Sequence, residues 1–231
     1  MHRVYDDWLD LMLYSLQGDD ENYIDTIDDY GEKDAQHFSK AFAELQYAMS
    51  ETDGDILGVV YEELGQSSDH FGQHFTPHSL SDVKAEMVIG EEHGDNEPYT
   101  VMDPASGSGR LLMSASKINP NGEFYGIDKD STCAKMTALN LTFFNLDGYA
   151  IHGDSLKMDY HRIWRTNQTI LGGEIRELDA DEWQSPYREN QQQDADYVEE
   201  DPLADPEEAD IDFDNLRETA LSDFNTDRDP E

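Results

Sequence analysis

The sequence predicts an α/β fold with an incomplete parallel sheet, preceded by a helical region and followed by an acidic, largely disordered tail. Two observations lead to this prediction. The first third of the 231 residues carries apolar stripes at helical spacing, and from residue 98 short β-branched and aromatic runs alternate with helical patterns. Such alternation is typical of a parallel sheet with helices on its faces. We therefore expect three regions, 1–66, 67–176 and 177–231.

The first region is expected to be helical because apolar residues recur there every three or four positions. The three stripes are Leu9, Met12, Leu13 and Leu16; then Phe38, Ala41, Phe42, Leu45 and Met49; then Ile56, Val60 and Leu64. Gly18 and the acidic stretch after it should end the first helix. We interpret these stripes as faces on which helices pack, not as a ligand site. After Pro77, residues 80–87 show a further helical pattern.

The second region should contain three strands, at 99–102, 123–127 and 149–152. Helical patterns at 111–116 and 133–144 separate them. Cys133 is the only cysteine, which excludes an internal disulfide and a cysteine-rich zinc site. It lies within an apolar helical pattern, so we expect a buried core residue and not a nucleophile.

Acidic residues dominate the whole chain, with 53 Asp and Glu against 15 Lys and Arg and a formal net charge of −38. Residues 177–231 hold 21 acidic and 3 basic residues, which leaves 32 acidic and 12 basic residues in 1–176. The region with a core pattern is therefore strongly acidic as well. At about 1 M salt the electrostatic screening length falls to about 3 Å, so we expect a protein adapted to a salt-loving host.

The sequence gives no sign of a membrane or metal protein. No apolar run approaches the length of a membrane span, and the N-terminus has no signal-peptide layout, so we expect a cytoplasmic protein. His70, His74 and His78 recur every four residues, a spacing that would align metal ligands on a helix. Pro77 interrupts any such helix, so we expect no metal site there.

The sharpest motif is Asp103-Pro-Ala-Ser-Gly-Ser-Gly109, between a predicted strand and a predicted helix. Glycines at such a turn let the backbone approach a ligand closely, and the helix N-terminus beyond it favours a negative group. Leu112 stands where the dinucleotide fingerprint requires a third glycine, so a nicotinamide cofactor is disfavoured. Asp103 instead suits a ligand with an amino group, because a carboxylate pairs with an ammonium.

Two more carboxylates follow the next two predicted strands. Asp128 comes 25 residues after Asp103, and an acidic residue at this strand end commonly receives ribose hydroxyls. Asp154 follows the third strand and can accept a hydrogen bond from an exocyclic amine such as that of adenine. Because the carboxyl ends of parallel strands meet at one edge of the sheet, we expect all three carboxylates to line one crevice.

Four segments, taken in order along the chain, match the motifs of one enzyme family. They are Gly72–Pro77 (GQHFTP), Asp103–Gly109, Phe124–Asn145 and His152–Leu156 (HGDSL). In these motifs the chain resembles the amino-methylating DNA methyltransferases, in particular the modification subunits of type I restriction systems. Asp55–Glu62 also resembles the helical domain of that family. The resemblance implies a Rossmann-like fold, S-adenosylmethionine as cofactor, and methylation of DNA at adenine N6.

The resemblance also implies a role for each residue that matches a family motif. The Phe-Thr-Pro segment and the glycine loop would hold the methionine part of the cofactor, and two aspartates would hold its ribose and its adenine. The residues are Phe75, Thr76, Pro77, Asp103, Gly107 and Gly109 for the methionine part, Asp128 for the ribose and Asp154 for the adenine.

The chain departs from the family at the catalytic loop, which reads Asn, Asp or Ser, then Pro-Pro, then an aromatic residue. No Pro-Pro occurs in this sequence, and the nearest string is Ser185-Pro186-Tyr187 in acidic surroundings. Two interpretations remain open. Either a specificity subunit or a second methyltransferase subunit completes an enzyme acting on DNA, or the chain is an inactive cofactor-binding regulator or an acidic anti-restriction protein. A charge of −38 argues against tight DNA binding by this chain alone.

Overall fold

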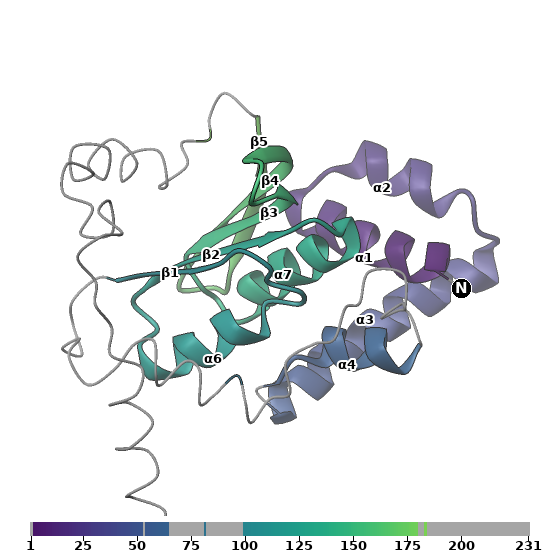
Figure 1. Ribbon diagram of the computed structural model, residues 1–231. Helices are drawn as coiled ribbons and strands as arrows, with labels where there is room; N and C mark the ends of the chain where they lie inside the picture. The colour runs from purple at the N-terminus through teal and green to yellow at the C-terminus, as the bar shows by residue number, and fades with distance from the viewer. Residues whose placement is uncertain (1, 53, 65–80, 82–98, 180–182, 184–231) are drawn as a thin grey trace, which may run out of the picture. The chain divides into compact units, whose positions relative to one another are not determined.

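Six helices and a five-stranded sheet make up the part of the chain that the computed structural model describes (Figure 1). This part comprises residues 2–52, 54–64, 81, 99–179 and 183. It lies within one unit, Met1–Trp183, and the second unit, Gln184–Glu231, falls outside the described residues. Most of the expected disordered tail, 177–231, and most of the helical pattern at 80–87 lie outside the described residues and therefore stay predictions.

The N-terminal helices are α1 (His2–Gln17), α2 (Asp20–Ile27), α3 (Glu32–Thr52) and α4 (Ile56–Glu63). The first stripe is confirmed for Leu9, Met12 and Leu13, which are almost fully buried, whereas Leu16 in the last turn is exposed. Helix α1 stops where Gly18 takes a positive φ of 70°. In α3 the second stripe is confirmed for Phe38, Leu45 and Met49, which are buried, whereas Phe42 is half-buried and Ala41 is exposed. No helix within the described ranges combines the length and the apolarity that a membrane crossing requires.

Two features of this region differ from the prediction. The core face of α4 is formed by Leu57 and Tyr61, whereas Ile56 and Val60 are half-buried and Leu64 is exposed. The buried face of α4 is thus shifted by one residue from the predicted stripe, because α4 is apolar on more than one side. The helix α2 was not predicted at all. It buries no side chain, so it has no apolar stripe to reveal it.

Three parallel strands form one half of the sheet, as predicted: β1 (Thr100–Asp103), β2 (Glu123–Asp128) and β3 (Gly148–Asp154). The connecting helices are α6 (Arg110–Ile118) and α7 (Ser131–Phe143). In the register, Asp103 lies opposite Gly126 and Asp128 lies opposite His152, so the carboxyl ends of the three strands share one edge of the sheet.

The other half of the sheet is an antiparallel hairpin that was not predicted. It consists of β4 (Asp159–Asn167), which pairs with β3, and β5 (Glu174–Leu178), so the strand order is β1-β2-β3-β4-β5. The expectation of a parallel sheet therefore holds for β1, β2 and β3, but the described sheet as a whole is mixed.

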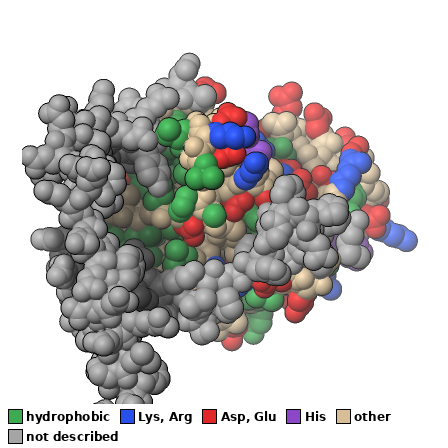
Figure 2. Space-filling view, in the orientation of Figure 1, with side chains coloured by type: hydrophobic (Ala, Val, Ile, Leu, Met, Phe, Trp, Pro, Cys, Tyr) green, Lys and Arg blue, Asp and Glu red, His purple; other side chains and the backbone are tan. Residues whose placement is uncertain are grey.

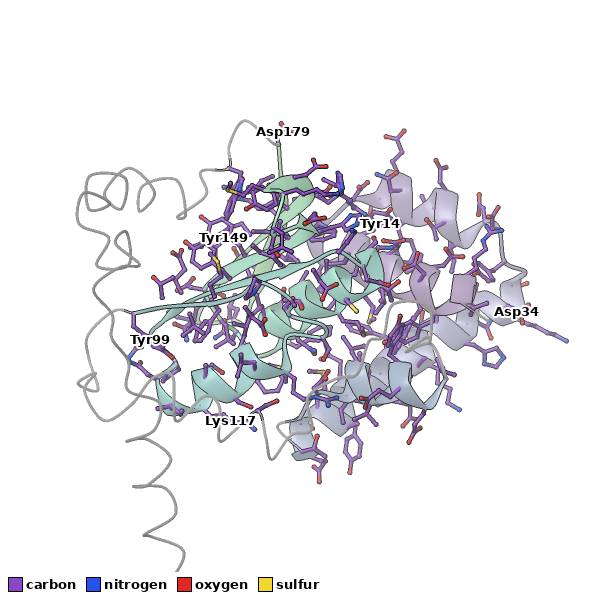
Figure 3. All side chains as sticks on the ribbon, in the orientation of Figure 1. Tyr14, Asp34, Tyr99, Lys117, Tyr149 and Asp179 are labelled. Atoms are coloured by element: carbon purple, nitrogen blue, oxygen red, sulfur yellow. The ribbon has the colours of Figure 1, made fainter. Side chains whose placement is uncertain are left out.

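The main core lies between one face of the sheet and the helices α1, α6 and α7 (Figure 1). Phe124 and Trp164 enter it from the sheet, and α7 is buried around most of its circumference, including Cys133 as predicted. A second, smaller apolar cluster occupies the opposite face, where Ile127 and Ile151 pack with Tyr149. Figure 3 labels Tyr149 on the sheet. The glycine loop, Asp103–Gly109, connects β1 to α6 at the carboxyl edge of the parallel strands.

Candidate functional site

The loop after β1 is held in place by the strand beside it. The backbone amide of Ser106 donates to the carbonyl of Ile127 at 2.9 Å, and the amide of Gly107 donates to Asp128 Oδ2 at 2.8 Å. Gly107 and Gly109 have positive φ angles of 57° and 84°, a conformation that other residues adopt only with strain. The glycines of the predicted motif therefore serve the shape of the loop.

Helix α7 contacts the same loop through Thr137. Its hydroxyl donates to the carbonyl of Gly107 at 3.0 Å and lies 3.1 Å from Ser106 Oγ. A Cβ atom on Gly109 would lie 3.3 Å from the Thr137 side chain, and one on Gly126 would lie 2.6 Å from it. Glycine at these two positions allows α7, β2 and the loop to pack closely.

Asp128 is held by backbone hydrogen bonds to both of its carboxylate oxygens. Its Oδ1 accepts the amide of Asp130 at 2.9 Å, and its Oδ2 accepts the amide of Gly107. Burial raises the pKa of this carboxyl, and the two backbone hydrogen bonds oppose that effect. Each carboxylate oxygen can accept a second hydrogen bond, so Asp128 retains acceptor capacity for hydroxyl groups.

Asp154 lies in a different electrostatic environment, at the end of β3. Its Oδ1 accepts the amides of Leu156 and Lys157, and its Oδ2 lies 3.3 Å from Lys129 Nζ and 3.6 Å from Lys157 Nζ. The hydrogen bond from the Lys157 amide lowers the pKa of this carboxyl, with further lowering by Lys129. A ligand amine that bound Oδ2 would have to compete with these two exposed lysines.

Direct contacts join the loops at the three strand ends. Gly107 bonds to Asp128, Lys129 pairs with Asp154, and Ser155 Oγ donates to the carbonyl of Pro104 at 2.9 Å. Asp103 Oδ1 accepts the amide of Ala105 at 3.1 Å, and the charge of Asp103 contributes to the raised pKa of Asp128. The structure thus brings the three loops together, and their ligand-binding role stays a prediction.

Several predicted residues lie outside the described part of the chain. They are Phe75, Thr76 and Pro77 of the proposed cofactor segment, the histidines His70, His74 and His78, and the string Ser185-Pro186-Tyr187. Within the described ranges, no group of three or more His, Cys, Asp or Glu side chains is placed to hold a metal ion.

One buried polar residue near the loop was missed by the sequence reasoning. Asp55 begins the segment that resembles the helical domain of the family, and its side chain is fully buried and reaches Ser108 and Arg110 at the glycine loop. The available signal was an aspartate directly before an apolar helical stretch, which is a typical helix N-cap. That signal predicts the helix cap, but the contacts of Asp55 with Ser108 and Arg110 are visible only in the folded structure.

Two surface features lie apart from the strand ends. An apolar groove of about 810 Å³ runs between α1, α3 and α4, lined by Trp8, Phe38 and Val60 among others. Acidic side chains are spread over the visible face of the N-terminal helices and do not gather in one patch (Figure 2). Neither feature adds a ligand group to the glycine loop.

The chain is similar over a short stretch to a curated protein, the type II methyltransferase M.XamI of Xanthomonas campestris pv. amaranthicola. The two are 27% identical over 84 residues, which are 36% of this chain and 15% of that enzyme. The chain thus matches only a small part of this much longer relative. No solved structure matches the chain significantly.

A family model gives the broader result. The model for N-6 DNA methylases matches residues 52–216, which include α4, the whole described sheet and the loops at its carboxyl edge. The match covers more than half of the chain. The chain therefore belongs to the N-6 DNA methylase family.

Proposed function

We propose that this chain is the S-adenosylmethionine-binding half of a DNA adenine-N6 methyltransferase of the restriction-modification type. The observation that carries the proposal is the set of contacts among the loops after β1, β2 and β3, each of which bears one carboxylate. Carboxyl ends of parallel strands in an open α/β sheet are the usual place for a nucleotide-like ligand. Membership of the N-6 DNA methylase family supports the same ligand and a DNA substrate.

Each part of the cofactor has a matching group in this site. The carboxylate of Asp103 suits the ammonium of the methionine part, and the left-handed turn at Gly107 and Gly109 follows it directly along the chain. Asp128 has acceptor capacity for the ribose hydroxyls, and Asp154 for the adenine amine. The proposal adds Phe75, Thr76 and Pro77 to the methionine side on the family resemblance alone.

The transfer step needs groups that these 231 residues lack. The cofactor, when bound, supplies an activated methyl group, and the target amine must be held in line with it. In the family a polar residue and a prolyl carbonyl accept hydrogen bonds from that amine, and an aromatic residue stacks the flipped base. Because the sequence contains no Pro-Pro, we propose that a loop from outside these residues, in a specificity or second methyltransferase subunit, completes the site.

The second candidate function is cofactor binding without catalysis, as a regulator or an acidic anti-restriction protein. The missing Pro-Pro loop and the net charge of −38 favour it. Both candidates require the cofactor site, so cofactor binding does not separate them. The two candidates differ in whether methyl transfer to DNA occurs when the missing loop is supplied.

The discriminating experiment measures transfer of tritiated methyl groups from S-adenosylmethionine to adenine-containing DNA in high KCl. We expect no incorporation by the chain alone, and incorporation when a fragment carrying an Asn-Pro-Pro-aromatic loop is added. Binding of the cofactor with no incorporation in the mixture would favour the regulator. Incorporation by the chain alone that Ser185→Ala or Tyr187→Ala abolishes would contradict the proposal and make that string the catalytic loop.

A further inference from the structure

A fully buried aspartate connects the N-terminal helices to the glycine loop. Asp55 caps helix α4, where its Oδ1 accepts the amide of Gly58 at 2.8 Å. The same oxygen accepts Asn140 Nδ2 of helix α7 at 2.9 Å. The other oxygen, Oδ2, faces the loop after β1 and accepts the hydroxyl of Ser108. One carboxylate therefore joins three segments that are far apart in the sequence.

Arg110 compensates the charge of this carboxylate. Its Nε and its Nη2 each lie 3.0 Å from Asp55 Oδ2, and both side chains are almost completely buried. Glu62, further along α4, lies 3.6 Å from the same guanidinium. A buried charge is tolerated only when it is paired and hydrogen-bonded, so Asp55 and Arg110 depend on each other.

The contacts of Asp55 bear on the residues that shape the loop. Ser108 and Arg110 flank Gly109, whose φ of 84° makes the turn into α6. Asn140 Nδ2 also donates to the carbonyl of Ser108 at 2.8 Å, so the backbone of the turn is held as well. The position of Gly109 is therefore fixed by side chains on both sides of it.

The approach of α4 to this loop depends on a glycine. A Cβ atom on Gly58 would lie 2.1 Å from Asp55 Oδ2 and 2.7 Å from Ser108 Oγ. Any larger residue there would displace the carboxylate from the loop. The sequence of α4 is thus matched to the loop that it supports.

We infer that Asp55 is a positioning residue, which ties the docking of α4 to the left-handed turn at Gly107–Gly109. The N-terminal helices then set the cofactor affinity of a loop that they do not themselves form. By linkage, a ligand on the loop stabilises the docked α4 to the same extent. The ligand part of this inference rests on the proposed function, and the loop part does not.

The test compares Asp55→Asn with Asp10→Asn in the full chain. Asparagine caps helices about as well as aspartate, so Asp55→Asn keeps the α4 cap and removes the charge that faces Ser108 and Arg110. Asp10 of α1 accepts Lys135 Nζ of α7 at 2.7 Å and touches no loop residue in the described contacts, so its variant reports a general loosening of the N-terminal helices.

The first measurement is the rate of amide hydrogen exchange in each variant without ligand. The variants are compared under conditions in which their free energies of global unfolding are equal. We expect Asp55→Asn to speed exchange at Gly107 and Gly109 at least tenfold, and Asp10→Asn to leave both amides within twofold of the wild type. Ser108→Ala, which leaves the buried charge pair intact, should speed exchange in the same direction by a smaller factor. Equal exchange in the two aspartate variants would overturn the inference. No change in Ser108→Ala would overturn it as well, and that result can be obtained even if Asp55→Asn fails to fold.

The second measurement is calorimetric titration with S-adenosylmethionine in high KCl. We expect the dissociation constant to rise at least tenfold in Asp55→Asn and to change less than twofold in Asp10→Asn. Unchanged affinity in Asp55→Asn would overturn the link to the cofactor. Failure of the wild type to bind would overturn the proposed function, while the exchange data would still decide the role of Asp55 in the loop.

Discussion

At the scale of single residues, the loop after β1 shows why glycine is needed at specific positions. Gly109 combines a φ of 84° with a close approach to Thr137, whereas Gly31 has no neighbouring atom within 4 Å of its missing Cβ. The two glycines are therefore a matched pair, one constrained by conformation and packing and one constrained by neither.

Gly109→Ala should lower the free energy of unfolding by about 1–2 kcal/mol, because a left-handed alanine is strained and Thr137 must move. Gly31→Ala should change it by less than about 0.5 kcal/mol. Urea unfolding of both variants in high KCl checks this prediction. An equal effect of the two substitutions would show that the loop does not hold Gly109 in the left-handed conformation.

The carboxylates of the site were predictable from the sequence, and their supports were not. Asp103, Asp128 and Asp154 each follow a short strand-like run, so local pattern alone places them at strand ends. Asp55 depends on donors 53 to 85 positions away along the chain. No local spacing encodes contacts of that range, and they exist only once α4, α6 and α7 have packed together.

At the scale of elements, the hairpin of β4 and β5 is the largest part of the fold that the sequence pattern did not reveal. Ile163 and Trp164 are adjacent and both buried, because they enter the clusters on opposite faces of the sheet. The strand therefore lacks the simple alternation of a half-exposed strand. Arg162 and Arg165 on either side of this pair further obscure it.

Trp164→Ala should lower the free energy of unfolding by about 3–5 kcal/mol, since a fully buried aromatic side chain is removed from the main core. Ile170→Ser serves as the control, because Ile170 is fully exposed in the turn between the two strands and should contribute less than about 0.5 kcal/mol. Chemical unfolding measures both. A loss below about 1 kcal/mol for Trp164→Ala would mean that β4 is not an integral strand of the sheet.

At the scale of the whole molecule, acidic charge is the dominant property. Residues 1–176 carry a formal charge of −20, so self-repulsion opposes folding at low salt. The described cations are used largely in ion pairs, such as Lys135 with Asp6 and Asp10, and Arg162 with Glu177. Most carboxylates have no such partner cation available, since acidic residues outnumber basic ones by 53 to 15.

The melting temperature should rise steeply between about 0.1 and 3 M KCl, because screening shortens from about 10 Å to below about 3 Å over this range. Circular dichroism melts measure it, with a protein of near-zero net charge in the same buffers as the control for general salt effects. A melting temperature that follows the control would contradict adaptation to high salt.

The central claim is that the carboxyl edge of the sheet binds S-adenosylmethionine, and calorimetric titration in high KCl tests it most directly. The wild type should bind saturably, and Asp128→Ala should weaken binding about ten- to a hundredfold, since loss of a charged hydrogen-bond partner costs about 1.5–3 kcal/mol. Asp147→Ala should bind like the wild type, because Asp147 accepts the amide of Gln168 and lies before β3, away from the carboxyl edge. A folded wild type that gives no saturable heat, or equal weakening by the two substitutions, would contradict the account.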